Sequence, residues 1–278
     1  MPPVTGYDPI GTVQAAITSL LSVQEPEFVG IGSRMFLAFA TILIVWHGIR
    51  MMLTARSSGE ELFSFAKLLL VIAFGYAMIA YYESPIPGIG TSFSNLITDQ
   101  AAYLANLLSA RSIQNAQQSL NTLWNALEQP DAWSILANLL YWTMLLVIGL
   151  AQFALLFVVS FGLIASAICA LLGPLFVPFF IVPTLEWIFW SWLKAFIQYS
   201  FMRVVANAFI FIFERFLTGF LLTLPPGLRL EEQLLYSVHV VMILVTFTVG
   251  VLLVPSLTSS IFSGRSGEST LPGQALGF

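Results

Sequence analysis

The chain alternates five long apolar stretches with shorter segments in which polar residues gather. Each stretch is long enough to cross about 30 Å of hydrocarbon as an α-helix. Lipid offers no hydrogen-bonding partners, so a spanning segment must satisfy its own backbone groups, as a helix does. The pattern predicts an all-α integral membrane protein with two transmembrane helices in 30–82 and three in 134–256. The five stretches are roughly 30–53, 62–82, 134–172, 193–222 and 234–256.

Residues 1–29 precede the first stretch and form an amphipathic segment. Apolar side chains recur there at helical spacing, with Thr and Gln on the opposite face. Proline disrupts a helix interior, so we predict a short helix that ends near Glu25-Pro26-Glu27. The apolar positions are Ile10, Val13, Ile17, Leu20 and Leu21.

The third stretch, 134–172, contains 39 residues without a formal charge. As one helix it would measure about 58 Å, at 1.5 Å per residue. It is either one long helix or two spans with almost no loop between them. We favour one helix, because no turn chemistry interrupts the stretch. A second crossing would reverse the orientation of everything that follows.

A proline-rich corner at 173–183 follows the third stretch. Gly173, Pro174, Pro178 and Pro183 should stop the helix there, because each proline lacks an amide donor and clashes with the preceding turn. Apolar, non-helical backbone is tolerated at membrane depth only where protein or water shelters it. The sequence therefore predicts a structural corner that is buried in protein or lines a water-filled space.

Aromatic residues crowd the beginning of the fourth stretch. Thr184 can cap this helix, and Glu186 would then lie in the first turn, where a carboxylate interacts favourably with the helix dipole. Trp187, Trp190 and Trp192 come next. Tryptophan is enriched at membrane interfaces, so these three residues predict an interfacial aromatic belt.

Residues 83–133 form the largest polar region, and 257–278 form a tail rich in Ser and Gly. Two amphipathic stripes in 83–133 predict two helices with a break near Arg111-Ser112. Their apolar faces need a partner, which is the chain's own membrane domain, the membrane surface or a neighbouring chain. We assign no partner contact to Phe93 or Ile97, and we expect a flexible tail.

The basic residues indicate an orientation. If the loop after the first span is cytoplasmic, six Lys and Arg residues lie inside and four outside, which favours an outer N-terminus and a cytoplasmic C-terminus. Residues 1–29 and 83–133 would then lie on the outer side. The inner residues are Arg50, Arg56, Lys67, Lys194, Arg203 and Arg265. The outer residues are Arg34, Arg111, Arg215 and Arg229.

Tyr199, Arg203 and Asn207 form a polar stripe, since they recur every four residues along the fourth stretch. A charged residue inside a span usually faces the bundle interior or a wet cavity, which would make this a lumen or inter-subunit stripe. Alternatively, Arg203 extends to the cytoplasmic headgroups. The sequence does not decide between these two interpretations.

The composition contains no sign of catalysis. Hydrophobic residues make up 58% of the chain and charged residues 9%, and the net charge of −4 does not indicate nucleic-acid binding. His47 and His239 lack companions at ligand spacing, so we expect no metal and no cofactor. No hydrolase, zinc-protease or phosphate-loop motif is present in the sequence. We predict that the protein is not an enzyme.

The segment GPLFVPFFIVPTLEWIFWSWLKAFIQYSFMRVVANA resembles the TrbL-like family of inner-membrane proteins from conjugative type IV secretion systems. The resemblance lies in a Gly-Pro-Leu-Phe corner, a Pro/Thr step, tryptophans and a tyrosine in the next helix. It is most specific over residues 162–207. The matching positions are Gly173, Pro174, Leu175, Phe176, Pro183, Thr184, Trp187 or Trp192, and Tyr199.

This resemblance implies a non-enzymatic scaffold or channel subunit in the bacterial inner membrane, at the base of the pilus or stalk. It implies a homo-oligomeric ring, for instance of five copies, that supports pilus assembly and the transfer of DNA or protein. The implied partners are pilin, the pilus-tip protein, other inner-membrane secretion subunits and lipid, with transient contact to the transferred DNA or protein.

A small-solute transporter or channel is the alternative function. Transporters often contain repeated halves with matching broken helices, whereas here the proline-rich corner occurs once. A lipid-associated assembly factor would also have a similar sequence. Neighbouring secretion genes would favour the scaffold, and substrate-dependent uptake into vesicles would favour the transporter.

Overall fold

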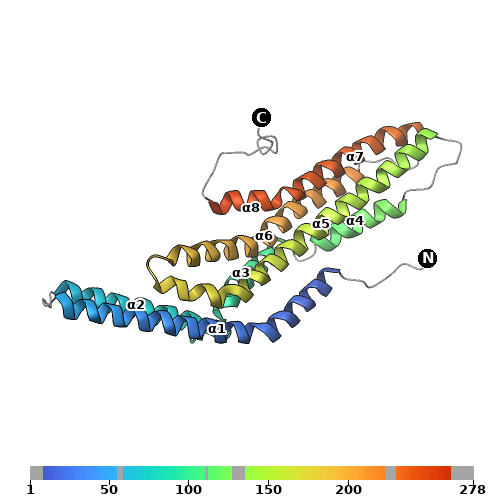
Figure 1. Ribbon diagram of the computed structural model, residues 1–278. Helices are drawn as coiled ribbons and strands as arrows, with labels where there is room; N and C mark the ends of the chain where they lie inside the picture. Colours follow the sequence, from blue (N-terminus) through green and yellow to red (C-terminus); the bar gives the residue numbers. More distant parts are fainter. Residues whose placement is uncertain (1–8, 55–58, 110–111, 127–134, 223–229, 264–278) are drawn as a thin grey trace. The chain divides into compact units, whose positions relative to one another are not determined.

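The computed structural model describes residues 9–54, 59–109, 112–126, 135–222 and 230–263. Within these ranges the chain forms eight α-helices and one 3-10 helix, and no strand (Figure 1). The elements are α1 Pro9–Thr54, α2 Gly59–Ala80, α3 Phe93–Ser109, α4 Ser112–Ala126, α5 Ile135–Phe176, η1 Val177–Ile181, α6 Glu186–Leu222, α7 Leu230–Leu252 and α8 Val254–Ser263. Arg56, Arg111, Arg229 and Arg265 lie outside the described residues, as do 1–8, 127–134 and 264–278.

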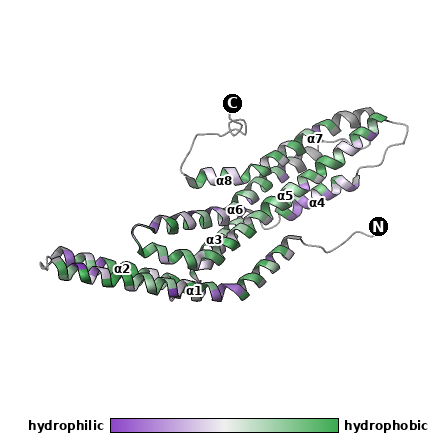
Figure 2. Ribbon diagram, viewed as in Figure 1, coloured by the Kyte–Doolittle hydropathy of each residue, from purple (hydrophilic) through white to green (hydrophobic). Residues whose placement is uncertain are grey.

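Within the described ranges, five helical segments are long and apolar enough to cross a membrane. The predicted all-α membrane fold with five spanning helices is therefore confirmed. Figure 2 shows hydrophobic residues along most of α5 and more hydrophilic residues along α4. The segments are Gly11–Leu53, Glu61–Ala80, Ile135–Ile181, Glu186–Phe216 and Val238–Phe262.

The chain divides into two compact units. The first contains residues 1–104 and 160–200, and the second contains residues 105–159 and 201–278. In the first unit, α1 and α2 pack side by side as an antiparallel hairpin, and η1 packs against both (Figure 1). In the second unit, the rings of Phe213 and Phe247 stack with their centroids 3.9 Å apart, which joins α6 to α7.

The predicted short N-terminal helix is wrong, because α1 continues through Pro26. Proline at this position removes only one backbone hydrogen bond, the one to the Ser22 carbonyl, and a bend can relieve its steric clash. Figure 1 shows α1 bent within its N-terminal half. The amphipathic segment and the first span are therefore parts of one helix of 46 residues.

The third stretch forms one helix, α5, as we favoured. α5 also continues through Gly173 and Pro174 to Phe176, so the predicted break over all of 173–183 is wrong at its beginning. The irregular backbone starts at η1 and lasts until α6 begins at Glu186.

The predicted tail also needs correction, because residues 257–263 are helical and belong to α8. Pro255 lies at the second position of α8, where a missing amide hydrogen breaks no helical hydrogen bond. Val254 and Thr258, one turn apart, are both buried, and this packing gives the helix a reason to form.

Candidate functional site: the buried proline elbow

The elbow comprises residues 173–185, from the end of α5 to the beginning of α6. Backbone hydrogen bonds within the elbow stabilise its turn. Pro178 stands in the first turn of η1, where no donor is required. The amide of Val182 then donates to the Phe179 carbonyl at 3.2 Å, and the amide of Leu185 donates to the Val182 carbonyl at 2.9 Å.

The elbow is buried by its own chain. Val177 and Ile181 expose 0% and 2% of their surface, and Pro178 is buried as well. Phe179 contacts Phe39 of α1 and Phe180 contacts Phe74 of α2, each with ring centroids 5.8 Å apart. Protein therefore shelters the irregular backbone, as an apolar environment requires.

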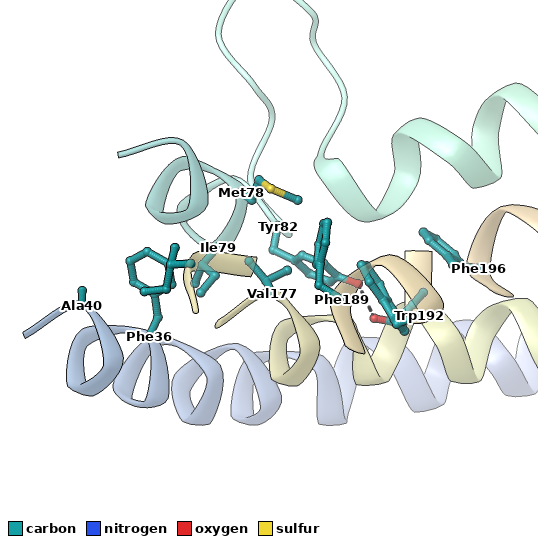
Figure 3. Close-up of a cluster of buried hydrophobic side chains, with 11 residues drawn as sticks. Phe36, Ala40, Met78, Ile79, Tyr82, Val177, Phe189, Trp192 and Phe196 are labelled. Carbon is teal, nitrogen blue, oxygen red and sulfur yellow. Dashed lines mark hydrogen bonds between the residues drawn. The ribbon is translucent and has the colours of Figure 1, made fainter. Parts of the chain in front are cut away.

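A tyrosine at the end of α2 replaces a hydrogen bond that Pro174 removes. In a regular helix the amide of residue 174 would donate to the carbonyl of Ala170, but proline has no amide hydrogen. The Tyr82 hydroxyl instead donates to this carbonyl at 2.5 Å. Figure 3 shows Tyr82 among Val177, Phe189 and Trp192. The side chain thus stabilises α5 at its weakest point.

Trp192 makes a second side-chain hydrogen bond to the backbone of α5. Its indole Nε1 donates to the Cys169 carbonyl at 2.9 Å. Tyr82, two residues after α2, and Trp192 of α6 therefore bind adjacent carbonyls of α5. Both rings are almost fully buried, at 0% and 6% exposure, so the bonds lie in an apolar setting where an unmade bond is costly.

Two glycines allow this close packing. A Cβ atom at Gly173 would collide with the Tyr82 hydroxyl and with the Trp192 ring. A Cβ atom at Gly32 of α1 would collide with the Pro174 carbonyl oxygen. In a regular helix that oxygen would accept from residue 178, which is also a proline. The two glycines let α1 and the Tyr82 and Trp192 side chains reach the proline-containing turn.

Burial raises the pKa of Tyr82 well above its usual range, and the nearby Glu25 and Glu83 carboxylates raise it further. Tyr82 therefore stays protonated and able to donate at neutral pH. Burial also raises the pKa of Glu83. The elbow is a packed structural joint, and nothing in this geometry activates a nucleophile.

The three predicted belt tryptophans do not share one environment. Trp187 and Trp190, one turn apart on α6, are 62% and 52% exposed. Trp192 points to the opposite side and is buried, stacked between Phe176 and Phe196. Its position on the helix turns it inward, so it faces the protein core. An interfacial location of Trp187, Trp190 and Trp192 stays a prediction.

The sequence assigned no contact to Phe93 or Ile97. Both pack against the buried hydrophobic cluster around the elbow, which includes Tyr82, Val177 and Ile181. The Phe93 ring lies 6.0 Å from that of Tyr82. In the second unit, α4 packs against its surroundings through the buried Leu120. The Asn121 side chain accepts a hydrogen bond of 3.0 Å from Gln152 of α5. Part of each amphipathic face is therefore covered by the chain itself.

The polar stripe has three different settings. Tyr199 meets the edge of Phe161, with ring centroids 6.2 Å apart. Asn207 is buried and its Nδ2 donates to the Ala105 carbonyl at 3.2 Å, while its Oδ1 accepts no hydrogen bond from the described residues. Arg203 is half-buried, and its buried Nε makes no hydrogen bond within the described ranges. The structure therefore does not bring the three side chains into one network.

Sequence reasoning located the elbow but missed Tyr82 and Gly32. Because a proline within a helix deprives the carbonyl four residues earlier of its donor, Pro174 leaves the Ala170 carbonyl in need of another one. Nothing in the sequence identified Tyr82 as the replacement, because 88 residues separate it from Ala170. Among the described residues, no group of three or more His, Cys, Asp or Glu side chains could hold a metal ion.

The sequence matches a known protein family. The family model described as TrbL/VirB6 plasmid conjugal transfer protein matches residues 40–256. A search of curated proteins found no match. The matched region includes the whole elbow and all of α2 to α7.

Proposed function

Because the chain belongs to the TrbL/VirB6 plasmid conjugal transfer protein family, we propose that it is a structural subunit in the inner-membrane part of a type IV secretion machine. Family membership makes it a component of conjugal transfer machinery, and its five apolar helices make it a multi-pass membrane protein. We further propose that it lies at the base of the pilus or stalk.

The observation that carries this proposal is the extent of the family match. Residues 40–256 include the C-terminal third of α1, the elbow and the beginning of α8. A match over one helix could reflect shared apolar composition, whereas this one extends across the whole helical arrangement. The match therefore supports family membership over the region that holds the elbow and α2 to α7, beyond the segment that is most specific in sequence.

Oligomerisation and partner binding are the finer parts of the proposal. Large apolar side chains remain exposed along the helices, including Trp46, Phe63, Trp142 and Ile212. Such faces suit lipid and neighbouring membrane subunits. We expect a homo-oligomeric ring that contacts pilin, the pilus-tip protein and other inner-membrane subunits, and that supports transfer of DNA or protein.

The subunit is proposed to act as a scaffold without a reaction of its own. The elbow hydrogen bonds connect helices, and their donors and acceptors are already used within the protein. A scaffold role requires rigid helix packing, which the elbow supplies.

The direct experiment deletes the gene in a conjugative host and restores it on a plasmid. We expect deletion to abolish conjugal transfer and pilus production, and the wild-type chain to restore both. Membrane cross-linking should then trap multimers of the chain together with other secretion subunits. Unchanged transfer after deletion would contradict the proposal, and uptake of a small solute by vesicles containing only this protein would support the transporter instead.

A further inference from the structure

Two buried polar atoms on α6, the Nε of Arg203 and the Oδ1 of Asn207, make no hydrogen bond to any described residue. The first atom carries a hydrogen to donate, and the second can only accept one. A buried polar group without a partner is costly in an apolar interior, so native proteins supply a partner for nearly all of them. The needs of these two atoms are complementary.

The two side chains are neighbours on α6. They are four positions apart, a spacing at which side chains lie next to each other on a helix surface. Nevertheless the two atoms do not bond to each other, since neither has a partner. The Nδ2 of Asn207 donates to the Ala105 carbonyl of α3 at 3.2 Å, which fixes the plane of the side-chain amide. Turning its oxygen toward Arg203 would break this bond to α3.

A molecule that serves both atoms must accept from Arg203 and donate to Asn207. An ionised carboxylate can accept from the guanidinium, but it has no hydrogen to offer the Asn207 oxygen. A second cation could donate to this oxygen, but the guanidinium would repel it. Water both accepts and donates, and internal waters typically make two to four hydrogen bonds to buried groups that are otherwise unpaired.

The surroundings of the pair also suit an internal water. Arg203 lies near the middle of the apolar segment Glu186–Phe216, where a charged side chain faces the bundle interior or water. Its side chain is half-buried, and that of Asn207 is 2% exposed. We propose that Arg203 and Asn207 hold an internal water molecule, which accepts from the Nε of Arg203 and donates to the Oδ1 of Asn207. Asn207 is then a positioning residue, because its bond to Ala105 sets where the acceptor lies.

The test uses the full-length protein in lipid nanodiscs, with isotope-labelled arginine side chains. Proton-detected solid-state NMR reports whether the Nε hydrogen of Arg203 lies next to a bound water. Arg203→Lys identifies the resonance, because lysine keeps the positive charge but lacks this N–H group. Arg215→Lys is the matched control, since Arg215 lies on the same helix, is exposed, and has the Phe211 ring 5.2 Å from its guanidinium carbon.

We expect a cross-peak between water and the Arg203 Nε hydrogen in the wild type and in Arg215→Lys, and its loss in Arg203→Lys. Asn207→Leu removes the acceptor, so the cross-peak should disappear while the Arg203 resonance remains. If Asn207→Leu does not fold, a density map of the wild type that shows ordered water decides the question. The map should contain a water within about 2.7–3.2 Å of both atoms.

Several results would overturn the proposal. One is a wild-type Arg203 resonance without a water cross-peak, and another is an unchanged cross-peak in a folded Asn207→Leu. In the density map, a direct bond between the Nε of Arg203 and the Oδ1 of Asn207 would exclude the bridge. A phosphate, carboxylate or side-chain hydroxyl in the place of the water would exclude it as well.

Discussion

Pro174 removes one amide hydrogen from α5, and the residue that supplies a replacement donor, Tyr82, lies 88 positions earlier in the chain. The bond is buried, so water cannot take its place if it is lost. Gly173 must be small for the Tyr82 hydroxyl to reach this turn. At the scale of single residues, the elbow depends on Pro174, Tyr82 and Gly173 together.

Replacing Tyr82 with Phe should destabilise the protein by about 1–3 kcal/mol, because it leaves the buried Ala170 carbonyl without a donor. In a Pro174→Ala background the same replacement should cost less, since alanine restores the backbone amide. Thermal unfolding in detergent of the four proteins in this cycle measures the coupling. Tyr81→Phe is the control, and an equal cost in both backgrounds would mean that Tyr82 acts through ring packing alone.

Adding one methyl group at Gly173 should also destabilise the elbow. Gly173→Ala forces the Tyr82 and Trp192 side chains apart, and we expect a loss of about 1–3 kcal/mol, as for other overpacked cores. Gly149→Ala, on the same helix, is the matched control because its new Cβ would meet only Trp124 at 3.9 Å. That control should be neutral or gain up to about 1 kcal/mol from helix propensity. Similar melting temperatures for both variants would contradict the close packing described above.

At the scale of elements, α1 and α5 tolerate prolines in their interiors, and α5 does so with help from α2 and α6. A helix can continue through proline when its orphaned carbonyl finds another donor or the helix bends. The irregular segment is consequently short, limited to η1 and the turn before Glu186.

The attachment of α4 to α5 can be tested through its side-chain hydrogen bond. Gln152→Leu should weaken this attachment, with a coupling to Asn121→Leu of about 0.6 kcal/mol, the average for polar pairs between membrane helices. A double-mutant cycle by thermal unfolding measures this coupling. Protease cleavage within 112–126 should become faster in the single variants. No coupling would show that the buried Leu120 and Ala116 alone hold α4.

Apolar runs and amphipathic stripes were sufficient to predict the five spans and the pair α3 and α4, because both signals are local in sequence. The direction in which a side chain points was less predictable. Trp192 looked like its neighbours Trp187 and Trp190, yet it faces the core. The roles of Tyr82 and Gly32 depend on contacts between distant segments, which no local pattern contains.

At the scale of the whole molecule, we predict that the two termini lie on opposite sides of the membrane, as five crossings require. The excess of basic residues predicts a cytoplasmic C-terminus, although several of these residues lie outside the described ranges. The proposed contacts with extracellular pilus components require the region 83–133 on the outer side. Orientation therefore decides which surfaces can meet which partners.

Single-cysteine labelling tests this orientation. In a Cys169→Ala background, an impermeant thiol reagent added to spheroplasts should label Gln114→Cys, because α4 is expected on the outer side. Ser58→Cys and Ser269→Cys should react only after the membrane is opened, since both are expected to be cytoplasmic. The reverse pattern would invert the orientation, and labelling of Gln114→Cys and Ser58→Cys from the same side would contradict a membrane crossing by α2.

The hydrogen bonds at Ala170 and Cys169 also impose an order on biogenesis. Tyr82 leaves the ribosome before α5 is made, whereas Trp192 emerges only after α5 is complete. Tyr82 can therefore reach the Ala170 carbonyl before Trp192 can reach the Cys169 carbonyl. We expect the N-terminal hairpin to be available for packing when the third span arrives, and a chain truncated before residue 192 to lack the second of the two bonds.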